Sequence, residues 1–203
     1  MKRDSADSLS GARTGPGRPR SKRSEEAILS ATTKLLTSEG YARLTLSKVA
    51  ARARASKSTI YRRWPTKEHL VIEAFNRWPA IVPRDKGDLL SDVMELYRQG
   101  VRILYNPPAN AIMPTLIAER ARNPALAAAL DPVMQRRRDP VRVVLNRAIA
   151  RRELPRETDV ELAIDALMGA SYLRMYFVDG DLSVKGMKKL FSLILRGIGA
   201  KNL

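Results

Sequence analysis

Hydrophobic residues recur along most of this chain at intervals of three and four positions, which is the period of an amphipathic α-helix. Thr45, Ser56 and Thr66 each precede such a segment and can cap its first turn, whereas Gly40 and Pro65 are signals for ending one. The pattern therefore predicts four helices in the first part of the chain, over residues 24–39, 46–53, 57–63 and 67–78.

A second group of helices is predicted beyond Pro79 and Pro83, which interrupt the periodic pattern and mark a boundary. Pro132 is expected to break a helix and Pro140 to kink or restart it, because proline lacks the N–H that a helix interior uses. The sequence Thr158–Glu161 has the pattern of a capping box and predicts a helix start. The predicted helices cover residues 88–105, 110–122, 125–152, 159–178 and 183–199.

No segment alternates between apolar and polar residues for long enough to predict a β-strand. The expected fold is therefore all-α, with about nine helices in a small N-terminal module and a larger helical body.

The charge distribution indicates a partner. The chain of 203 residues has a formal net charge of +16, and its first 65 residues carry 15 Lys and Arg against 5 Asp and Glu. A positive surplus concentrated in one segment is typical of proteins that bind a polyanion such as DNA. From charge alone, a basic flexible tail that aids solubility is the alternative interpretation.

Other classes of protein are disfavoured by what the sequence lacks. It has no cysteine, so disulfides and thiolate metal sites are excluded, and His69 is its single histidine. No apolar run approaches the ~18 residues of a membrane span, and the start of the chain lacks the apolar centre of a secretory signal. No nucleophile or phosphate-loop motif is present. We therefore expect a cytoplasmic protein that is not an enzyme and uses no metal or other cofactor.

The most informative segment runs from Tyr41 to Lys67, where a turn at residues 54–56 separates two short predicted helices. A helix that enters the major groove of DNA needs small or polar residues on its outward side and apolar anchors behind it. Ile60 and Trp64 can be those anchors. The side chains expected to contact DNA are Thr45, Ser56, Lys57, Ser58, Thr59, Tyr61, Arg62, Arg63, Thr66 and Lys67.

Different roles are expected within this set. Ser58 and Thr59 are small enough to let the helix lie deep in the groove, and Tyr61 and Arg63 can reach phosphate oxygens. The next helix begins at Thr66, where free backbone N–H groups favour another phosphate.

This segment closely resembles the DNA-binding domain of the TetR family of bacterial repressors. The resemblance covers residues 24–75, and a looser similarity to a TetR-type C-terminal domain covers residues 88–199. It implies a helix-turn-helix, a double-stranded DNA operator as partner, and a homodimer that places two recognition helices on a palindromic site. The matching residues are Gly40, Tyr41, Thr45, Val49, Ala50, Ser56, Lys57, Thr59, Ile60, Tyr61 and Trp64 to Glu68.

Two positions depart from the family pattern. Arg54 stands in the turn where the family commonly has glycine, so the turn is expected either to hold a non-glycine residue at a strained angle or to follow a different path. Ser47 stands where the family often has a longer polar residue, and it is expected to read less of the DNA or none.

The predicted domains are a disordered basic arm over residues 1–23, a DNA-binding domain over 24–70, and a regulatory and dimerisation domain over 71–203. The Gly-Arg-Pro core of the arm resembles an AT-hook. Arg18 and Arg20 can therefore enter the narrow minor groove of A·T-rich DNA, and the alternative is a tail that raises only non-specific affinity.

The last two helices carry apolar stripes that can form a four-helix dimer interface with their symmetry mates, or can equally belong to the core of one chain. The small residues Gly169, Ala170 and Ser171 would allow a partner helix to approach closely. The residues expected at the interface are Val160, Ile164, Leu167, Ser171, Leu190, Phe191, Ile194, Leu195 and Ile198.

The resemblance also implies a pocket whose small-molecule ligand releases the repressor from DNA. An apolar lining favours a largely apolar ligand, although each candidate can instead be ordinary core. The candidates are Trp78, Tyr97, Met113, Leu116, Met134, Met168 and Tyr172. The run from Arg136 to Arg138 is expected to be a solvated helix face.

An alternative interpretation is that the chain binds DNA but is not controlled by a small-molecule ligand. In that case the chain is a regulator or a nucleoid-associated protein without a small-molecule effector.

Overall fold

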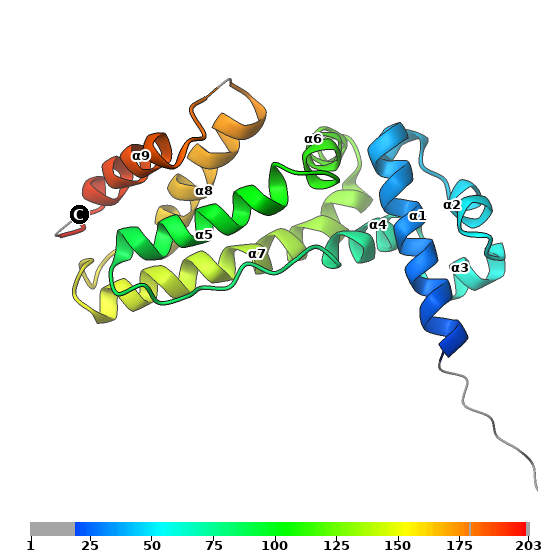
Figure 1. Ribbon diagram of the computed structural model, residues 1–203, viewed down its shortest axis with the longest axis horizontal. Coiled ribbons are helices and arrows are strands. Elements are labelled where there is room, and N and C mark those ends of the chain that lie inside the picture. The colour runs from blue at the N-terminus through cyan, green and yellow to red at the C-terminus, as the bar shows by residue number, and fades with distance from the viewer. Residues whose placement is uncertain (1–18, 179, 202–203) are drawn as a thin grey trace, which may run out of the picture.

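The computed structural model describes residues 19–178 and 180–201, and it shows an elongated, all-helical molecule (Figure 1). These residues form nine helices and no β-strand, which confirms the predicted fold class. Arg18 and most of the predicted arm lie outside the described residues, as does the side chain of Arg20. The helices are α1 (Pro19–Arg43), α2 (Leu46–Ala53), α3 (Lys57–Arg63), α4 (Lys67–Asn76), α5 (Leu89–Leu104), α6 (Ala109–Arg120), α7 (Pro124–Ala150), α8 (Val160–Tyr176) and α9 (Val184–Gly197).

Helices α1, α2 and α3 form one end of the molecule, which we call the head. Helix α1 begins at Pro19, before the predicted start at Ser24, so the last residues of the expected arm are helical. Gly40 interrupts α1 with a φ of 76°, in the left-handed region that glycine adopts without strain. Ile28, Val49 and Ile60 from the three helices are buried together, which fixes α2 and α3 against α1.

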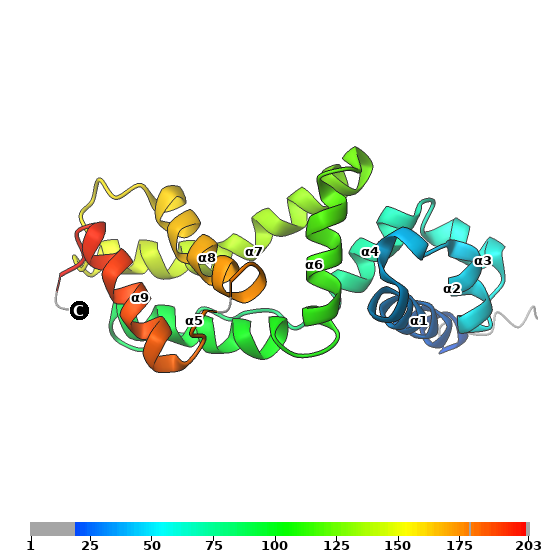
Figure 2. The same ribbon diagram turned by 90° about the horizontal axis from the view of Figure 1, so that it is seen from above.

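The opposite end of the molecule, which we call the body, contains α5, α7, α8 and α9. Helices α5 and α7 run side by side along its length, α8 packs on α7, and α9 packs on α5 and α8 (Figures 1 and 2). Leu89, Leu145, Ile164 and Leu195, one from each helix, lie in its core. No described helix is both long and apolar enough to cross a membrane.

Helices α4 and α6 join the head to the body. Helix α4 packs on α1 and α7, and α6 packs on α1, α5 and α7 and stands across the molecule between the two ends (Figure 2). The apolar core of the head continues into α6 at Ile112 and Leu116 and into α7 at Leu126. The core therefore does not divide at residue 70, where the sequence placed a domain boundary.

Helix α7 passes through two internal prolines without a break. The sequence predicted a break at Pro132, and this is wrong, because α7 continues through both Pro132 and Pro140. Each proline removes one helix hydrogen bond, but α7 packs on α4, α5, α6 and α8, and this packing maintains the helix. Pro124 occupies the first turn, where no N–H is needed. Helix α8 is capped by the Asp159 side chain, one residue after the predicted Thr158.

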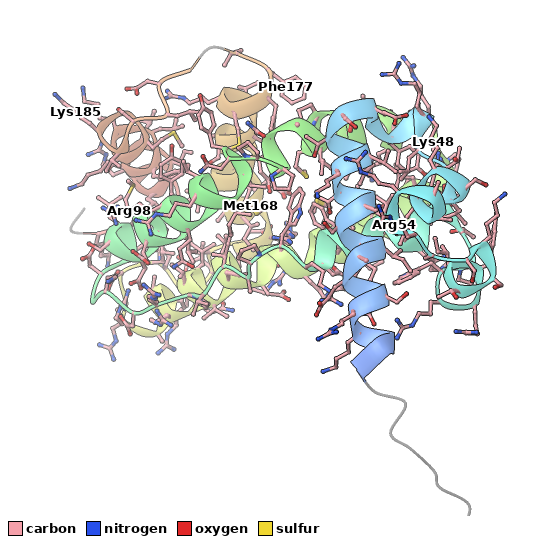
Figure 3. All side chains as sticks on the ribbon, turned by 45° about the vertical axis from the view of Figure 1, so that its right-hand side comes forward. Lys48, Arg54, Arg98, Met168, Phe177 and Lys185 are labelled. Carbon is pink, nitrogen blue, oxygen red and sulfur yellow. The ribbon has the colours of Figure 1, made fainter. Side chains whose placement is uncertain are left out.

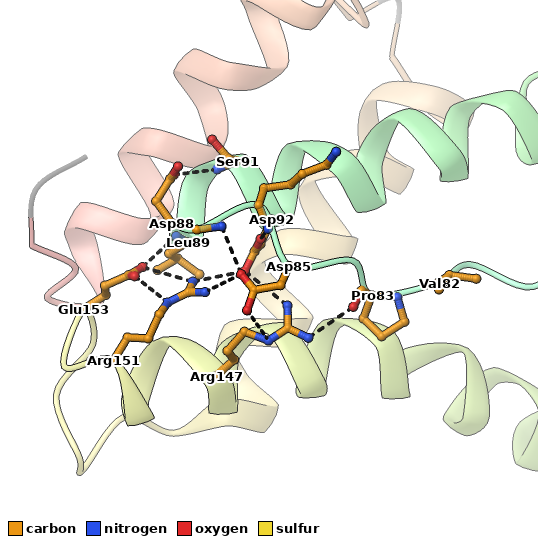
Figure 4. Close-up of polar contacts among 12 residues, drawn as sticks. Val82, Pro83, Asp85, Asp88, Leu89, Ser91, Asp92, Arg147, Arg151 and Glu153 are labelled. Atoms are coloured by element: carbon orange, nitrogen blue, oxygen red, sulfur yellow. Dashed lines mark hydrogen bonds and ion pairs between the residues drawn. The ribbon is translucent and has the colours of Figure 1, made fainter.

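A buried carboxylate fixes the far end of the body (Figure 4). Asp92 on α5 is fully buried and accepts from Arg151 at 3.0 Å and from the backbone N–H of Lys86 at 2.6 Å. Arg147 lies 3.4 Å from the same carboxylate, and Asp85 pairs with both arginines. A buried charge is tolerated only when it is paired and hydrogen-bonded in this way. The cluster therefore holds the segment before α5 against the last turns of α7.

Candidate nucleic-acid interface

Helix α3 presents a polar side to solvent and an apolar side to the head. Ile60 is fully buried and Trp64, its C-cap residue, is nearly so, which anchors the helix against α1 and α2. The side chains that it leaves exposed include Lys57, Ser58, Tyr61 and Arg62, all of which were expected to contact DNA. The face that this short helix offers to solvent therefore has the small and cationic groups that a major groove can receive.

The turn before α3 holds Arg54 in the left-handed conformation, with φ 52° and ψ 40°. The first of the two expectations for this position is therefore correct. The backbone N–H of Ala55 donates to the carbonyl of Ala50 at 3.0 Å, and this bond closes the end of α2 as a Schellman-type cap. Glycine is the usual residue there because a side chain strains the left-handed conformation.

Three hydroxyl groups cluster at the start of α3. The Ser56 side chain caps the helix by accepting from the N–H of Thr59 at 3.2 Å, and its Oγ lies 2.8 Å from Thr59 Oγ1 and 3.0 Å from Ser58 Oγ. Thr59 is half-buried, whereas Ser58 is exposed. Of the two small residues expected to let the helix lie deep in the groove, Ser58 is therefore the more accessible. Thr45 and Thr66 are likewise exposed and cap α2 and α4 with their side chains.

Two of the expected phosphate-binding cations already have partners. Arg63 Nη1 lies 2.8 Å from Glu25 Oε2 on α1, and Arg77 Nη2 lies 2.6 Å from the other oxygen of the same carboxylate. Lys67 donates to the carbonyl of Tyr41 at 3.2 Å, with its ammonium 4.0 Å from the centroid of the Tyr41 ring. The ammonium of Lys67 is thus directed into the head.

Other exposed cations of the head were not among the residues expected to contact DNA. Lys48 and Arg54 lie at the two ends of α2 (Figure 3), and both are exposed together with Arg52. Lys48 already forms an ion pair, since its ammonium lies 2.5 Å from the carboxylate of Glu39. Within the described residues, Arg52 and Arg54 form no ion pair. The position of Arg54 in the turn immediately before α3 was the signal that could have added it to the DNA-contacting set.

A hydrogen-bonded chain links the head to α4 and α7. The hydroxyl of Tyr41 donates to the carboxylate of Glu68 in the first turn of α4, and it accepts from the side chain of Asn123, the N-cap of α7, at 3.3 Å. Burial and the bond to Glu68 raise the pKa of Tyr41. Burial alone would raise the pKa of Glu68, but the hydrogen bonds from Tyr41, a backbone N–H and Thr66, together with the charge of Lys67, outweigh it, and that pKa lies below its usual value. The pair therefore stays in one protonation state around neutral pH.

Five of the seven candidate pocket residues line one cavity of about 110 Å³ in the body. Figure 3 shows Met168 on this side of the molecule, away from the head. Trp78 instead lines a more open groove beside the cavity, and Leu116 is fully buried between α6 and the head. The five residues that share the cavity are Tyr97, Met113, Met134, Met168 and Tyr172.

The structure revises the expected dimer face. Four of the nine residues, Ile164, Leu167, Phe191 and Leu195, are buried in the core of the protomer itself, where a partner helix cannot reach them. The other five are half-buried. The apolar positions that α8 leaves exposed follow one stripe at helical spacing: Leu162, Ala166, Gly169, Leu173 and Phe177.

Comparisons with known proteins agree with this architecture. Residues 28–74 match the family model of bacterial regulatory proteins of the tetR family, and residues 83–192 match that of the tetracyclin repressor-like C-terminal domain. The chain is 39% identical over 133 residues to an uncharacterised HTH-type transcriptional regulator of Mycobacterium tuberculosis, a match that covers 64% of this chain and 65% of the relative. It thus spans just under two thirds of that relative.

Two further proteins match over more of their length. The DNA-binding transcriptional repressor TetR of Mycobacteroides abscessus is 32% identical over 150 residues, which cover 68% of this chain and 75% of the relative. Among solved structures, the TetR family transcription regulator SCO0332 aligns with a TM-score of 0.66 and 27% identity, over 87% of this chain and 98% of that one.

Proposed function

This chain belongs to the TetR family of bacterial transcriptional regulators, and from that membership we propose that it is a homodimeric repressor that a small ligand releases from a palindromic operator. The observation that carries the proposal is the exposed polar side of α3, which is anchored from behind by Ile60 and Trp64. Such a protein acts where the chromosome is, in the bacterial cytoplasm.

Two copies of the chain are needed for tight binding. Helix α3 has only seven residues, so one copy contacts few base pairs, and a two-fold axis doubles the contacts on a palindromic site. The exposed stripe on α8 supplies a surface for that axis, with Leu162 66% and Phe177 68% exposed. A Cβ added at Gly169 would meet no atom of the protomer within 4 Å. This open space supports the proposed close approach of a partner helix at Gly169.

Helix α4 connects the proposed ligand site to the head. Phe75, near the end of α4, lines the cavity, while the start of α4 holds Tyr41 through Glu68. A ligand that repacks the cavity wall at Phe75 therefore shifts α4, and α4 packs directly on α1. Since the two recognition helices must match the spacing of two half-sites, a small shift of each head is enough to weaken binding.

The decisive experiment selects bound duplexes from a random pool with the full-length protein, then titrates the enriched duplex and a scrambled version of it. We expect a two-fold symmetric consensus bound at least about 10³-fold more tightly than the scrambled duplex. We also expect a steep fall in affinity with salt, because several phosphates are neutralised. Selection that enriches no sequence would contradict the proposal.

Two variants of α3 separate its proposed roles. Tyr61→Phe removes a hydroxyl that can bond to phosphate, so we expect weaker binding to the consensus and to the scrambled duplex alike. Ser58→Ala changes the accessible group that faces the bases, so we expect it to alter the enriched sequence instead. If the two variants behave alike, the proposed orientation of α3 in the groove is wrong.

The second candidate function is a DNA-binding regulator or nucleoid-associated protein without an effector. It would give the same salt dependence, and a nucleoid-associated protein would enrich little sequence. It is favoured if no small molecule shifts the DNA affinity.

A further inference from the structure

Arg137 lies in the wall of the body cavity with its guanidinium against the end of α4. The guanidinium carbon is 4.5 Å from the centroid of Phe75 and 5.9 Å from that of Trp78, and Nη2 lies 3.3 Å from the carbonyl oxygen of Phe75. The same side chain lines the neighbouring groove, which shares Ile81 and Pro140 with the cavity. Arg137 therefore separates the cavity from a more open surface.

This half-buried guanidinium lacks the acidic partner that a charge withdrawn from water normally has. Its Nε is buried without a hydrogen-bond partner, and no acidic side chain in the described part of the chain lies within ion-pair distance of it. Burial lowers the pKa of Arg137. The next residue, Arg138, is instead neutralised by Glu161 and Asp165. A guanidinium has five N–H donors, and withdrawing them from water without an anion costs free energy.

The rest of the cavity is apolar and deformable, with one further polar group. Met113, Met134 and Met168 are in its wall, and methionine side chains adapt readily to a guest. The Tyr172 side chain lines the same space, and its hydroxyl forms no hydrogen bond to any residue that the structure describes. The cavity thus combines one uncompensated cation, one free hydroxyl and an apolar interior of about 110 Å³.

We propose that this cavity binds a small organic acid, with its carboxylate on Arg137 and Tyr172 and its apolar body among the methionines. A cavity of this size accommodates a body of about four or five carbon atoms, since a 150 Å³ cavity holds the six carbons of benzene. The planar guanidinium matches a carboxylate through two parallel hydrogen bonds. The proposal rests on the proposed ligand release and names the chemical class of the ligand.

The same geometry connects the acid to DNA release. A carboxylate on Arg137 competes with the Phe75 carbonyl and with the two aromatic rings for the guanidinium. A guanidinium–carboxylate pair, in which both groups are charged, is stronger than the 3.3 Å bond to a neutral carbonyl. The acid therefore loosens the contact between α7 and the end of α4.

Calorimetry on the full-length dimer tests the proposal with matched probes. Pentanoate and hexanoate are the acids, and pentanamide and hexanamide are the neutral analogues of the same shape. We expect each acid to bind at least about 10-fold more tightly than its analogue, because the bond to a charged group is lost. We also expect the acids, and not the analogues, to lower the affinity for the selected operator duplex.

Two substitutions assign the effect to the proposed residue. Arg137→Gln is expected to remove the preference for acids, and Arg137→Lys to restore part of it. The matched control is Arg102→Gln, an equal loss of charge at an exposed position of the cavity-lining helix α5. We expect that variant to bind the acids as the unchanged protein does. The comparison of acids with analogues needs no variant, so it stands even if Arg137→Gln does not fold.

The outcomes separate this inference from the proposed function. If hexanamide and hexanoate bind equally and both release DNA, ligand release stands and the acid preference is wrong. Inorganic phosphate that binds as tightly as hexanoate would also overturn the inference, because charge alone would then suffice. If none of the four probes binds, the inference is likewise overturned, whereas the DNA-binding function is judged by the duplex selection alone.

Discussion

At the scale of single residues, Glu25 on α1 holds two arginines of the head through one carboxylate. Replacing it by Gln releases Arg63, which lies at the end of α3, so that it can contact a phosphate. We expect Glu25→Gln to tighten binding to specific and scrambled DNA alike. The salt dependence should steepen by about 0.9 in the slope of log K against log salt for one added phosphate contact.

The matched control for this prediction is Glu26→Gln. Glu26 is exposed, and among the described residues it forms no ion pair, so the substitution makes the same change in net charge without releasing an arginine. Fluorescence anisotropy over a salt series measures both slopes. Equal slopes for the two variants would mean that Arg63 does not reach the DNA.

Arg54 gives a second prediction at this scale, which concerns stability. Its left-handed backbone strains any residue with a side chain, whereas glycine is free of that strain. We expect Arg54→Gly to raise the free energy of unfolding in urea by up to about 1 kcal/mol. Arg52→Gly, inside α2, should instead lower it by about 1 kcal/mol. A destabilised Arg54→Gly would show that its side chain contributes more than the strain costs.

The sequence predicted which residues of α3 are exposed, but it did not predict which of the nearby cations already have a partner. The positions of Ile60 and Trp64 followed from helical periodicity, which requires no tertiary information. The pairing of Arg63 with Glu25 joins residues far apart in the chain, and the position of Lys67 over Tyr41 does the same. The expectation that Arg136 to Arg138 form a solvated helix face is wrong for Arg137 for the same reason, since its surroundings come from α4 and α8.

At the scale of helices, α7 and α8 are fastened by charged side chains. Arg142 Nε lies 2.6 Å from Glu161, and Arg138 Nη2 lies 2.9 Å from it. Hydrogen bonds from Arg142 and then from Arg138 lower the pKa of Glu161 to about 2. The two arginines therefore favour the ionised carboxylate in the folded protein.

This low pKa predicts a pH dependence of stability. The pKa of Glu161 in the unfolded chain is about 4.3, which is above its value in the folded protein. The ionised Glu161 side chain therefore adds to the free energy of unfolding above about pH 4.3, and this stabilisation is lost as the pH falls toward about 2. We expect Glu161→Gln to lower the melting temperature at pH 7, with a difference that shrinks by pH 3. Glu157→Gln, at an exposed position, is the control. A difference that stays constant with pH would contradict the assignment.

Helix positions followed from periodicity and capping residues, but the behaviour of α7 did not. Proline in a helix interior costs a hydrogen bond and argues for a break. Whether the helix continues depends on the packing that offsets this cost, and α7 contacts four other helices. The local sequence shows that Pro132 removes a helix hydrogen bond, but it does not show the packing that offsets this loss.

At the scale of the whole molecule, the sequence could not tell which apolar positions remain exposed after folding. Helix α8 is apolar on more than one side. The face that carries Ile164 and Leu167 is buried in the core that α8 shares with α5 and α9. The stripe from Leu162 to Phe177 is what remains for another molecule. Exposed apolar surface that continues along one helix is typical of an interface.

Ala166 lies in the middle of that stripe and decides whether it joins two copies of the chain. Ala166→Glu places two carboxylates near the two-fold axis, where burial makes like charges costly, so we expect a monomer by light scattering and a large loss of operator affinity. Ala128→Glu makes the same change at an exposed position of α7 and should leave a dimer that binds the operator. The two variants should have the same helical content, since both sites face solvent within helices. An Ala166→Glu protein that remains a dimer would place the two-fold axis on another face, and α8 would then need a different partner.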